Sequence, residues 1–140
     1  MERAEIKEVV RKSEIFSSLE DDELDLLLYY GDERRFPSGE TIYRTGEAAE
    51  GKFSLILKGT IEIVAETDRL IRRMGVGEVI GEIGATSPQS KRTATAKTAE
   101  PTWLLEWHLG YIKDHWPAIM KKLKDQAWKR LSNYYELVSN

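Results

Sequence analysis

The sequence contains no cysteine, which excludes disulfide bonds and thiolate metal ligands. It contains only two histidines, so it is also poor in zinc ligands. It has no run of about eighteen apolar residues, and residues 1–5 lack the basic and then apolar pattern of a signal peptide. We therefore expect a cytoplasmic protein with no metal site and no membrane span.

The length and charge of the chain fit a single domain. With 140 residues, of which 41% are hydrophobic and 32% are charged, the chain is large enough to bury a substantial core. The net charge is −3, but the second half is mildly basic, partly because basic residues gather within 121–130. Such a group indicates either a nucleic-acid surface or the solvated face of a helix. The acidic overall charge favours the solvated face, because it attracts phosphate polymers poorly.

Residues 1–31 carry two amphipathic helical patterns. The second pattern follows Ser18-Leu19-Glu20-Asp21, which has the form of a capping box, and stops at Gly31, where we expect a left-handed helix cap. These two helices would cover part of a larger body. The apolar positions that they would bury are Ile6, Val9, Val10, Leu24, Leu27 and Leu28.

Residues 33–107 contain short strand-like segments separated by turn residues. Segments 53–57 and 60–64 alternate apolar and polar residues, and Lys58-Gly59 between them has the length of a hairpin turn. Regularly spaced short strands of this kind are typical of a sandwich or a closed barrel. The clearest expected strands are 41–44, 53–57, 60–64, 70–74, 93–98 and 103–107. We expect about eight strands in a mainly β, jelly-roll-like barrel, a double-stranded β-helix with flanking helices.

Residues 108–140 return to helical patterns. A short helix precedes Pro117, which suits the first turn of the next helix because its missing N–H costs little there. An apolar stripe then marks a long C-terminal helix. The stripe would pack on the barrel or, in part, pair with the same helix of a second subunit, since about twenty helical residues extend ~30 Å. We expect a homodimer through this helix. The stripe consists of Met120, Leu123, Ala127, Leu131, Tyr134 and Val138.

Residues 77–96 combine glycines with isolated charges in a way that indicates an anion site. Gly81 and Gly84 allow unusual backbone angles and let a ligand approach main-chain N–H groups. Arg92 would supply a planar, permanently charged fork for phosphate oxygens, while Glu82 would accept hydrogen bonds from sugar hydroxyls. The alternative interpretation is an ordinary glycine turn in a β-rich protein.

The order of helices and strands, together with Gly81-Glu82 and Arg92-Thr93-Ala94-Thr95, resembles the cyclic nucleotide-binding domain family. Nearly the whole chain takes part in this resemblance, and the spacing of the two motifs is like that of the bacterial catabolite-activator branch. Segments 15–19, 36–47 and 53–63 are similar to the N-terminal helical signature, the first barrel strands and the central hairpin of the family.

The resemblance implies a role for each matching residue. Glu82 would bind the ribose 2′-hydroxyl, Arg92 would hold the cyclic phosphate, and backbone N–H groups around Gly81, Ile83 and Thr93 would complete the site. A hydroxyl at Thr93 is associated with guanine but also occurs in adenine binders, so the ligand is cAMP or cGMP, with cGMP favoured. The implied ligand-binding residues are Gly81, Glu82, Ile83, Gly84, Arg92, Thr93 and Ala94. The candidate base contacts are Ile71, Val79, Ile80, Gln126, Trp128 and Arg130.

The sequence also departs from the pattern of the family. Ile80 replaces the usual aromatic residue, and Gly84 and Thr86 stand where larger apolar residues are common. These departures predict a looser pocket or a changed ligand.

Two functions from different classes therefore remain. The first is a non-enzymatic regulatory sensor that binds a cyclic nucleotide and relays its occupancy through the C-terminal helix to an effector protein. The alternative is a ligand-independent module for dimerisation or protein interaction on the same fold. An enzyme is disfavoured because no nucleophile or metal ligand accompanies the carboxylates. DNA binding is disfavoured because no recognition-helix unit follows the last helix.

Overall fold

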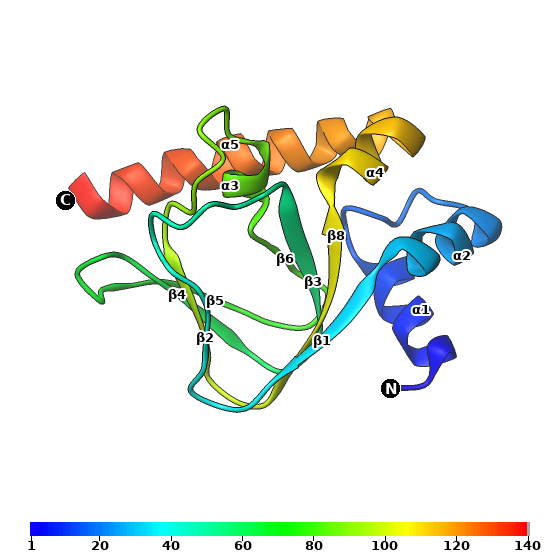
Figure 1. The fold of residues 1–140 in the computed structure, drawn as a ribbon, viewed down its shortest axis with the longest axis horizontal. Helices are drawn as coiled ribbons and strands as arrows, with labels where there is room; N and C mark the ends of the chain where they lie inside the picture. The colour runs from blue at the N-terminus through cyan, green and yellow to red at the C-terminus, as the bar shows by residue number, and fades with distance from the viewer. Residues whose placement is uncertain (140) are drawn as a thin grey trace.

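The computed structural model describes the backbone of residues 1–139 and the side chains of residues 1–134. Eight strands form two four-stranded antiparallel sheets, with two helices beside one sheet and a long helix across one end (Figure 1). The predicted fold class is confirmed. The first sheet has the order β1 (Asp32–Phe36), β8 (Thr102–His108), β3 (Lys52–Lys58) and β6 (Val79–Ile80). The second has the order β2 (Thr41–Tyr43), β7 (Thr95–Thr98), β4 (Ile61–Val64) and β5 (Leu70–Met74).

Four of the described helices begin and end close to where the sequence predicts, whereas α3 was not expected and two of the expected caps are wrong. The helices are α1 (Arg3–Lys12), α2 (Asp21–Tyr30), α3 (Glu82–Thr86), α4 (Leu109–His115) and α5 (Pro117–Ser139). The N-cap of α2 is Glu20, which forms a capping box with Glu23, so Ser18 lies outside the helix. Gly31 ends α2 with an extended backbone, φ −84°, because the chain runs directly into β1. Glycine is needed there for space, since a Cβ would lie 2.8 Å from the Leu105 side chain.

β3 is a strand buried on both faces, which explains why the expected hairpin at Lys58-Gly59 does not form. All five residues 53–57 are buried. Phe53, Leu55 and Leu57 pack with the helices in the larger core cluster, whereas Ile56 belongs to the smaller cluster inside the roll. Since both faces are covered, β3 lies between β8 and β6, and the chain crosses into the other sheet before β4. The hairpin in this region joins β4 to β5.

Gly59 makes the crossing between the sheets and cannot readily be replaced. Its φ is +100°, and an added Cβ would collide with Thr102 Oγ1 and lie 2.6 Å from the Pro101 carbonyl oxygen. We expect Gly59→Ala to lower the free energy of unfolding by about 2–3 kcal/mol, because it adds a steric clash to backbone strain. Urea denaturation measures this loss.

Gly39→Ala is the matched control for this prediction. Gly39 has φ +78° and nothing within 4 Å of an added Cβ, so only the backbone strain of about 1 kcal/mol remains. Equal losses in the two variants would contradict the predicted clash at the sheet crossing.

The larger core cluster attaches the helices to the outer face of the first sheet. The Trp107 ring packs 5.1 Å from the Phe16 ring and 5.8 Å from the Phe53 ring, measured between centroids. Its indole N–H donates to the carbonyl oxygen of Leu27 in α2, at 2.8 Å. Burial of these aromatic residues, with a satisfied indole N–H, fixes the helices beside the sheet.

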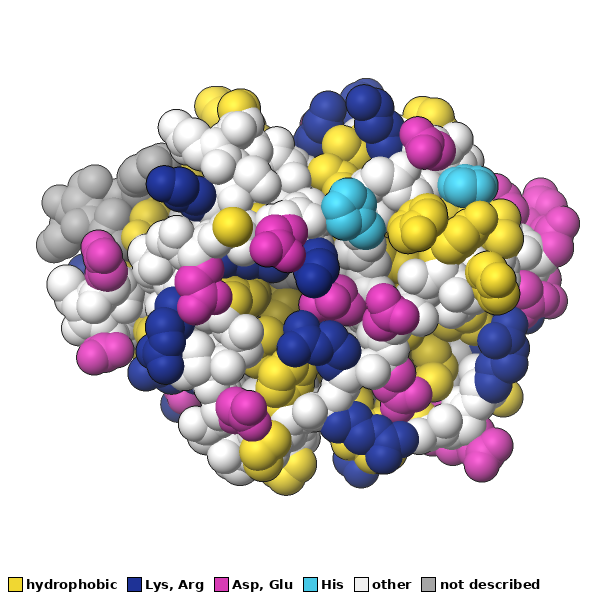
Figure 2. All heavy atoms as spheres, viewed as in Figure 1, with side chains coloured by type: hydrophobic (Ala, Val, Ile, Leu, Met, Phe, Trp, Pro, Cys, Tyr) yellow, Lys and Arg dark blue, Asp and Glu magenta, His cyan; other side chains and the backbone are white. Residues whose placement is uncertain are grey.

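The surface of the described part is charged and mixed. Figure 2 shows Lys and Arg side chains interspersed with Asp and Glu side chains over one face. Ion pairs join several charged side chains of the described part, for example Arg34 and Glu106 at 2.9 Å. No helix in the described part of the chain is long and apolar enough to cross a membrane.

Candidate functional site

A cavity of about 200 Å³ lies between the two sheets, α3 and α5. Every one of the seven ligand-binding residues predicted from the sequence lines it, together with three of the candidate base contacts, Ile71, Ile80 and Arg130. The other lining residues are Tyr43, Ile63, Arg72, Met74, Asn133 and Tyr134. The cavity therefore joins an apolar wall to a small number of charged side chains, as small-molecule sites commonly do.

Gly81 starts α3 and shapes one end of the cavity. It is the N-cap of α3, with φ 83° and ψ 2°. An added Cβ would lie 2.8 Å from Arg92 Nη1, so the residue needs both the left-handed conformation and the missing side chain. The N–H groups of the first helical turn that follows have no acceptor within the helix. They are the backbone donors that the sequence predicts around Gly81 and Ile83.

Arg92 lies almost entirely inside the protein, with 9% of its surface exposed. Its Nη1 and Nη2 donate to the carbonyl oxygens of Gly81 and Lys52, each at 2.9 Å. Its guanidinium lies over the Tyr43 ring, with 4.3 Å between Cζ and the ring centroid. Burial lowers the pKa of Arg92, but an arginine stays protonated in proteins. A fixed positive charge therefore faces the cavity.

Tyr43 is a wall residue that the sequence analysis missed. Burial raises the pKa of its phenol to about 12, so the ring stays neutral at physiological pH. The ring supports the Arg92 guanidinium from β2, which is far from Arg92 in the sequence. Nothing in the local sequence marks this pairing, because it depends on β2 lying beside β7.

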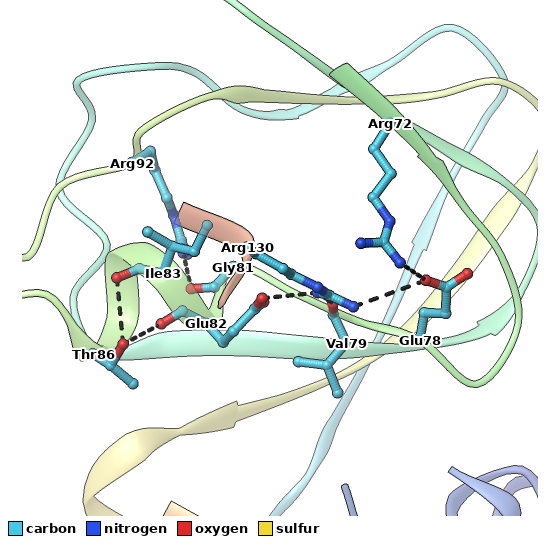
Figure 3. A network of polar contacts seen from close by, with 9 residues as sticks. All are labelled: Arg72, Glu78, Val79, Gly81, Glu82, Ile83, Thr86, Arg92 and Arg130. Carbon is cyan, nitrogen blue, oxygen red and sulfur yellow. Dashed lines mark hydrogen bonds and ion pairs between the residues drawn. The ribbon is translucent and has the colours of Figure 1, made fainter. Parts of the chain in front are cut away.

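Glu82 and Arg130 form a buried ion pair that ties α5 to α3 (Figure 3). Glu82 is 2% exposed, and its Oε1 accepts a hydrogen bond from Arg130 Nη1 at 2.8 Å. The same Nη1 donates to the carbonyl oxygen of Val79. Val79 thus meets Arg130 through its backbone, and the buried Val79 side chain does not line the cavity.

Two of the candidate base contacts lie elsewhere on α5. Trp128 is 72% exposed and does not line the cavity. It is two residues from Arg130, which places it on the opposite side of a helix with 3.6 residues per turn. Gln126 precedes Arg130 by one turn and lines a separate groove near Glu14 and Ile15. Neither the Trp128 nor the Gln126 side chain lines the cavity in this structure.

Gly84 and Thr86, two of the positions at which the sequence departs from the family pattern, are closely packed. Gly84 is buried, and an added Cβ would lie 3.0 Å from the Lys91 carbonyl oxygen and 3.2 Å from Ala49 Cβ. The missing side chain lets α3 approach its neighbours closely. Thr86 Oγ1 donates to the Glu82 carbonyl oxygen at 2.7 Å and so stabilises α3.

The site has no metal-binding character in the described part of the chain. No group of three or more His, Asp or Glu side chains is placed there to hold a metal ion. A cavity that is lined by three arginines, one buried carboxylate and an apolar wall is suited instead to a small organic anion.

Comparison with known proteins identifies this class of domain. The cyclic nucleotide-binding domain family matches residues 33–114, more than half of the chain, so the chain belongs to this family. It is 28% identical over 148 residues to the cAMP-activated global transcriptional regulator CRP of Haemophilus influenzae, covering 99% of this chain. The chain spans 65% of the length of that relative.

Solved structures share the fold at low identity. The Thermus thermophilus catabolite activator protein superposes with a TM-score of 0.74 and is 24% identical, covering 89% of this chain and 61% of that chain. The regulatory subunit of a cAMP-independent protein kinase A from Trypanosoma brucei superposes with a TM-score of 0.81 and is 18% identical, covering 92% of this chain and 47% of that chain. Both structures are less than 25% identical to this chain, so these two likenesses concern the fold alone.

Proposed function

We propose that this domain binds a cyclic nucleotide, cAMP or cGMP, and acts as a non-catalytic regulatory sensor. The observation that carries the proposal is the convergence of Arg92 and Glu82, both buried, on one cavity with an apolar wall. An exposed arginine and glutamate would need no explanation, but buried charges are retained where they are paired or functional.

In this proposal Arg92 binds the phosphate of the ligand and Glu82 binds its ribose. Arg92 Nη1 already donates to the carbonyl oxygen of Gly81, the N-cap of α3. The Arg92 fork and the backbone N–H groups of Glu82 and Ile83 would share a cyclic phosphate there. Glu82 uses Oε1 for Arg130, so Oε2 is the oxygen that would accept from a ribose hydroxyl. The base would lie against the apolar wall that includes Ile71 and Ile80.

The α5 helix is placed to report occupancy. The cavity volume of about 200 Å³ is below the roughly 300–1,000 Å³ of typical ligand sites. A nucleotide would therefore displace α5 or Arg130 as it binds. Such a ligand shifts the position of α5 only by its difference in affinity for the two positions.

A thermal-shift titration tests the binding proposal. A ligand at a hundredfold its dissociation constant adds about 2.7 kcal/mol of stability. We expect millimolar cAMP or cGMP to raise the unfolding midpoint by several degrees, whereas the matching 5′-monophosphates, which lack the cyclic ester, have a smaller effect. An unchanged midpoint with both cyclic nucleotides would reject the proposal.

A second candidate function is a ligand-independent dimerisation or docking module, which the exposed Trp128 on α5 favours. A 72% exposed tryptophan on a long helix is typical of a surface that meets another protein. In this proposal α5 pairs with a second copy or with an effector protein. A normal response to nucleotide from a protein with a monomeric mass in solution would exclude this second candidate.

A further inference from the structure

An open groove of about 900 Å³ lies between α1 and the turn that joins β5 to β6. It shares no lining residue with the cavity that contains Arg92. Its apolar floor consists of Met1, Ala4, Val9 and Val76. Val76, in the turn, is 56% exposed. An apolar groove of this kind is typical of a surface that another protein covers.

The rim of the groove is acidic. Four carboxylates and one lysine line it, namely Glu5, Glu8, Glu14, Glu78 and Lys12. Other basic side chains of α1 are turned toward α2, where Lys7 and Arg11 pair with Asp21 at 3.0 and 2.8 Å. Glu5 and Glu14 form no ion pair with any described residue. The groove therefore favours a partner surface with an apolar centre and basic surroundings.

The exposed side of α5 has this chemistry. Trp128 is 72% exposed, and Lys124 and Lys121 precede it by one and two helical turns, so the three share one side of the helix. Both lysines are exposed and form no ion pair within the described part of the chain. This side is turned away from the domain, because Arg130 on the opposite side of α5 lines the cavity. Trp128 therefore cannot enter the groove of its own chain.

We propose that a second copy of this chain occupies the groove, with its Trp128 on the apolar floor and its Lys121 and Lys124 against the carboxylates. A tryptophan in a desolvated pocket is the kind of residue that dominates the affinity of an interface, whereas the surrounding charges orient the partner. The groove and the Trp128 side of α5 are different surfaces, so the contact is head-to-tail. Each pair keeps one free groove and one free Trp128, and assembly continues beyond two copies.

Sedimentation velocity of the nucleotide-free full chain at rising concentration tests this inference. We expect the wild type to exceed the mass of two copies. Trp128→Ser removes the anchor and Val76→Glu places a charge on the floor, so each is expected to weaken self-association roughly tenfold or more. An equimolar mixture of the two variants is expected to form one-to-one dimers and nothing larger, because only one intact groove and one intact Trp128 are available to each pair.

Tyr29→Ser and Leu70→Glu are the matched controls. Tyr29 on α2 is 79% exposed and Leu70 on β5 is 44% exposed, and both lie outside the groove. They are expected to associate as the wild type does, and all four variants are expected to keep the circular dichroism spectrum of the folded wild type.

Three results would each overturn the inference. The first is a wild type that stays monomeric, and the second is a mixture of Trp128→Ser and Val76→Glu that forms no dimer. The third is a Val76→Glu protein that associates as the wild type does while Trp128→Ser does not, because Trp128 would then meet a surface other than the groove. None of these results bears on nucleotide binding, which the thermal-shift titration measures separately.

Discussion

Replacement of Arg92 with alanine is expected to abolish measurable binding of cAMP and cGMP. A cyclic phosphate held by the Arg92 fork would lose two charge-assisted hydrogen bonds, each contributing about 1.5–3 kcal/mol. The dissociation constant should therefore rise roughly a hundredfold or more. Titration of the purified variant with each nucleotide measures the change.

The same substitution also tests the structural role of Arg92. Loss of its donors leaves the carbonyl oxygens of Gly81 and Lys52 without these bonds, which should lower the stability of the nucleotide-free protein by about 1–3 kcal/mol. Arg92→Lys is the companion variant, because it keeps the charge and loses the fork. It should restore part of the binding. An Arg92→Ala protein that is folded and binds nucleotide as the wild type does would contradict the assigned role.

Replacement of Arg130 with alanine is expected to lower the free energy of unfolding by about 3 kcal/mol. The variant leaves Glu82, which is 2% exposed, as a buried carboxylate without its cation. Removing one partner of a buried ion pair costs more than the pair itself contributes, because the remaining charge is desolvated. Chemical denaturation of the nucleotide-free protein measures the loss.

A second substitution separates this charge effect from simple loss of packing. Glu82→Gln in the Arg130→Ala protein removes the unpaired charge, so it should recover a large part of the lost stability. Lys129→Ala, on the exposed side of α5, is the control and should change stability by less than about 0.5 kcal/mol. Strictly additive losses for Glu82→Gln and Arg130→Ala would show that the pair does not hold α5 in place.

The strand-like segments predicted from the sequence coincide with six of the eight described strands, and β1 and β6 were missed. β1 is mostly polar and exposed, and β6 has only two residues, so neither shows a strand period. It is harder to predict from the sequence which strands pair than to predict where the strands are. Apolar alternation in 53–57 fits a hairpin edge as well as a central strand, and only the burial of both faces distinguishes the two.

The candidate site was accessible from the sequence where its residues are close in the chain. Gly81, Glu82 and Arg92 belong to one local motif, and the cavity contains all three. Tyr43 and Arg72 line the cavity from other strands, β2 and β5. Their positions depend on how the strands pair and on which side of each strand is turned toward the cavity. On α5, the sequence did not show which face of the helix is turned toward the cavity. Arg130 lines the cavity, whereas Trp128, only two residues away, lies on the surface.

A crystal structure of the domain grown with millimolar cGMP or cAMP tests the central claim most directly. We predict nucleotide in the cavity, with phosphate oxygens on the Arg92 guanidinium and a ribose hydroxyl on the Glu82 carboxylate. A structure at these concentrations with an empty cavity, and with Arg92 still bonded only to the carbonyl oxygens of Gly81 and Lys52, would contradict it.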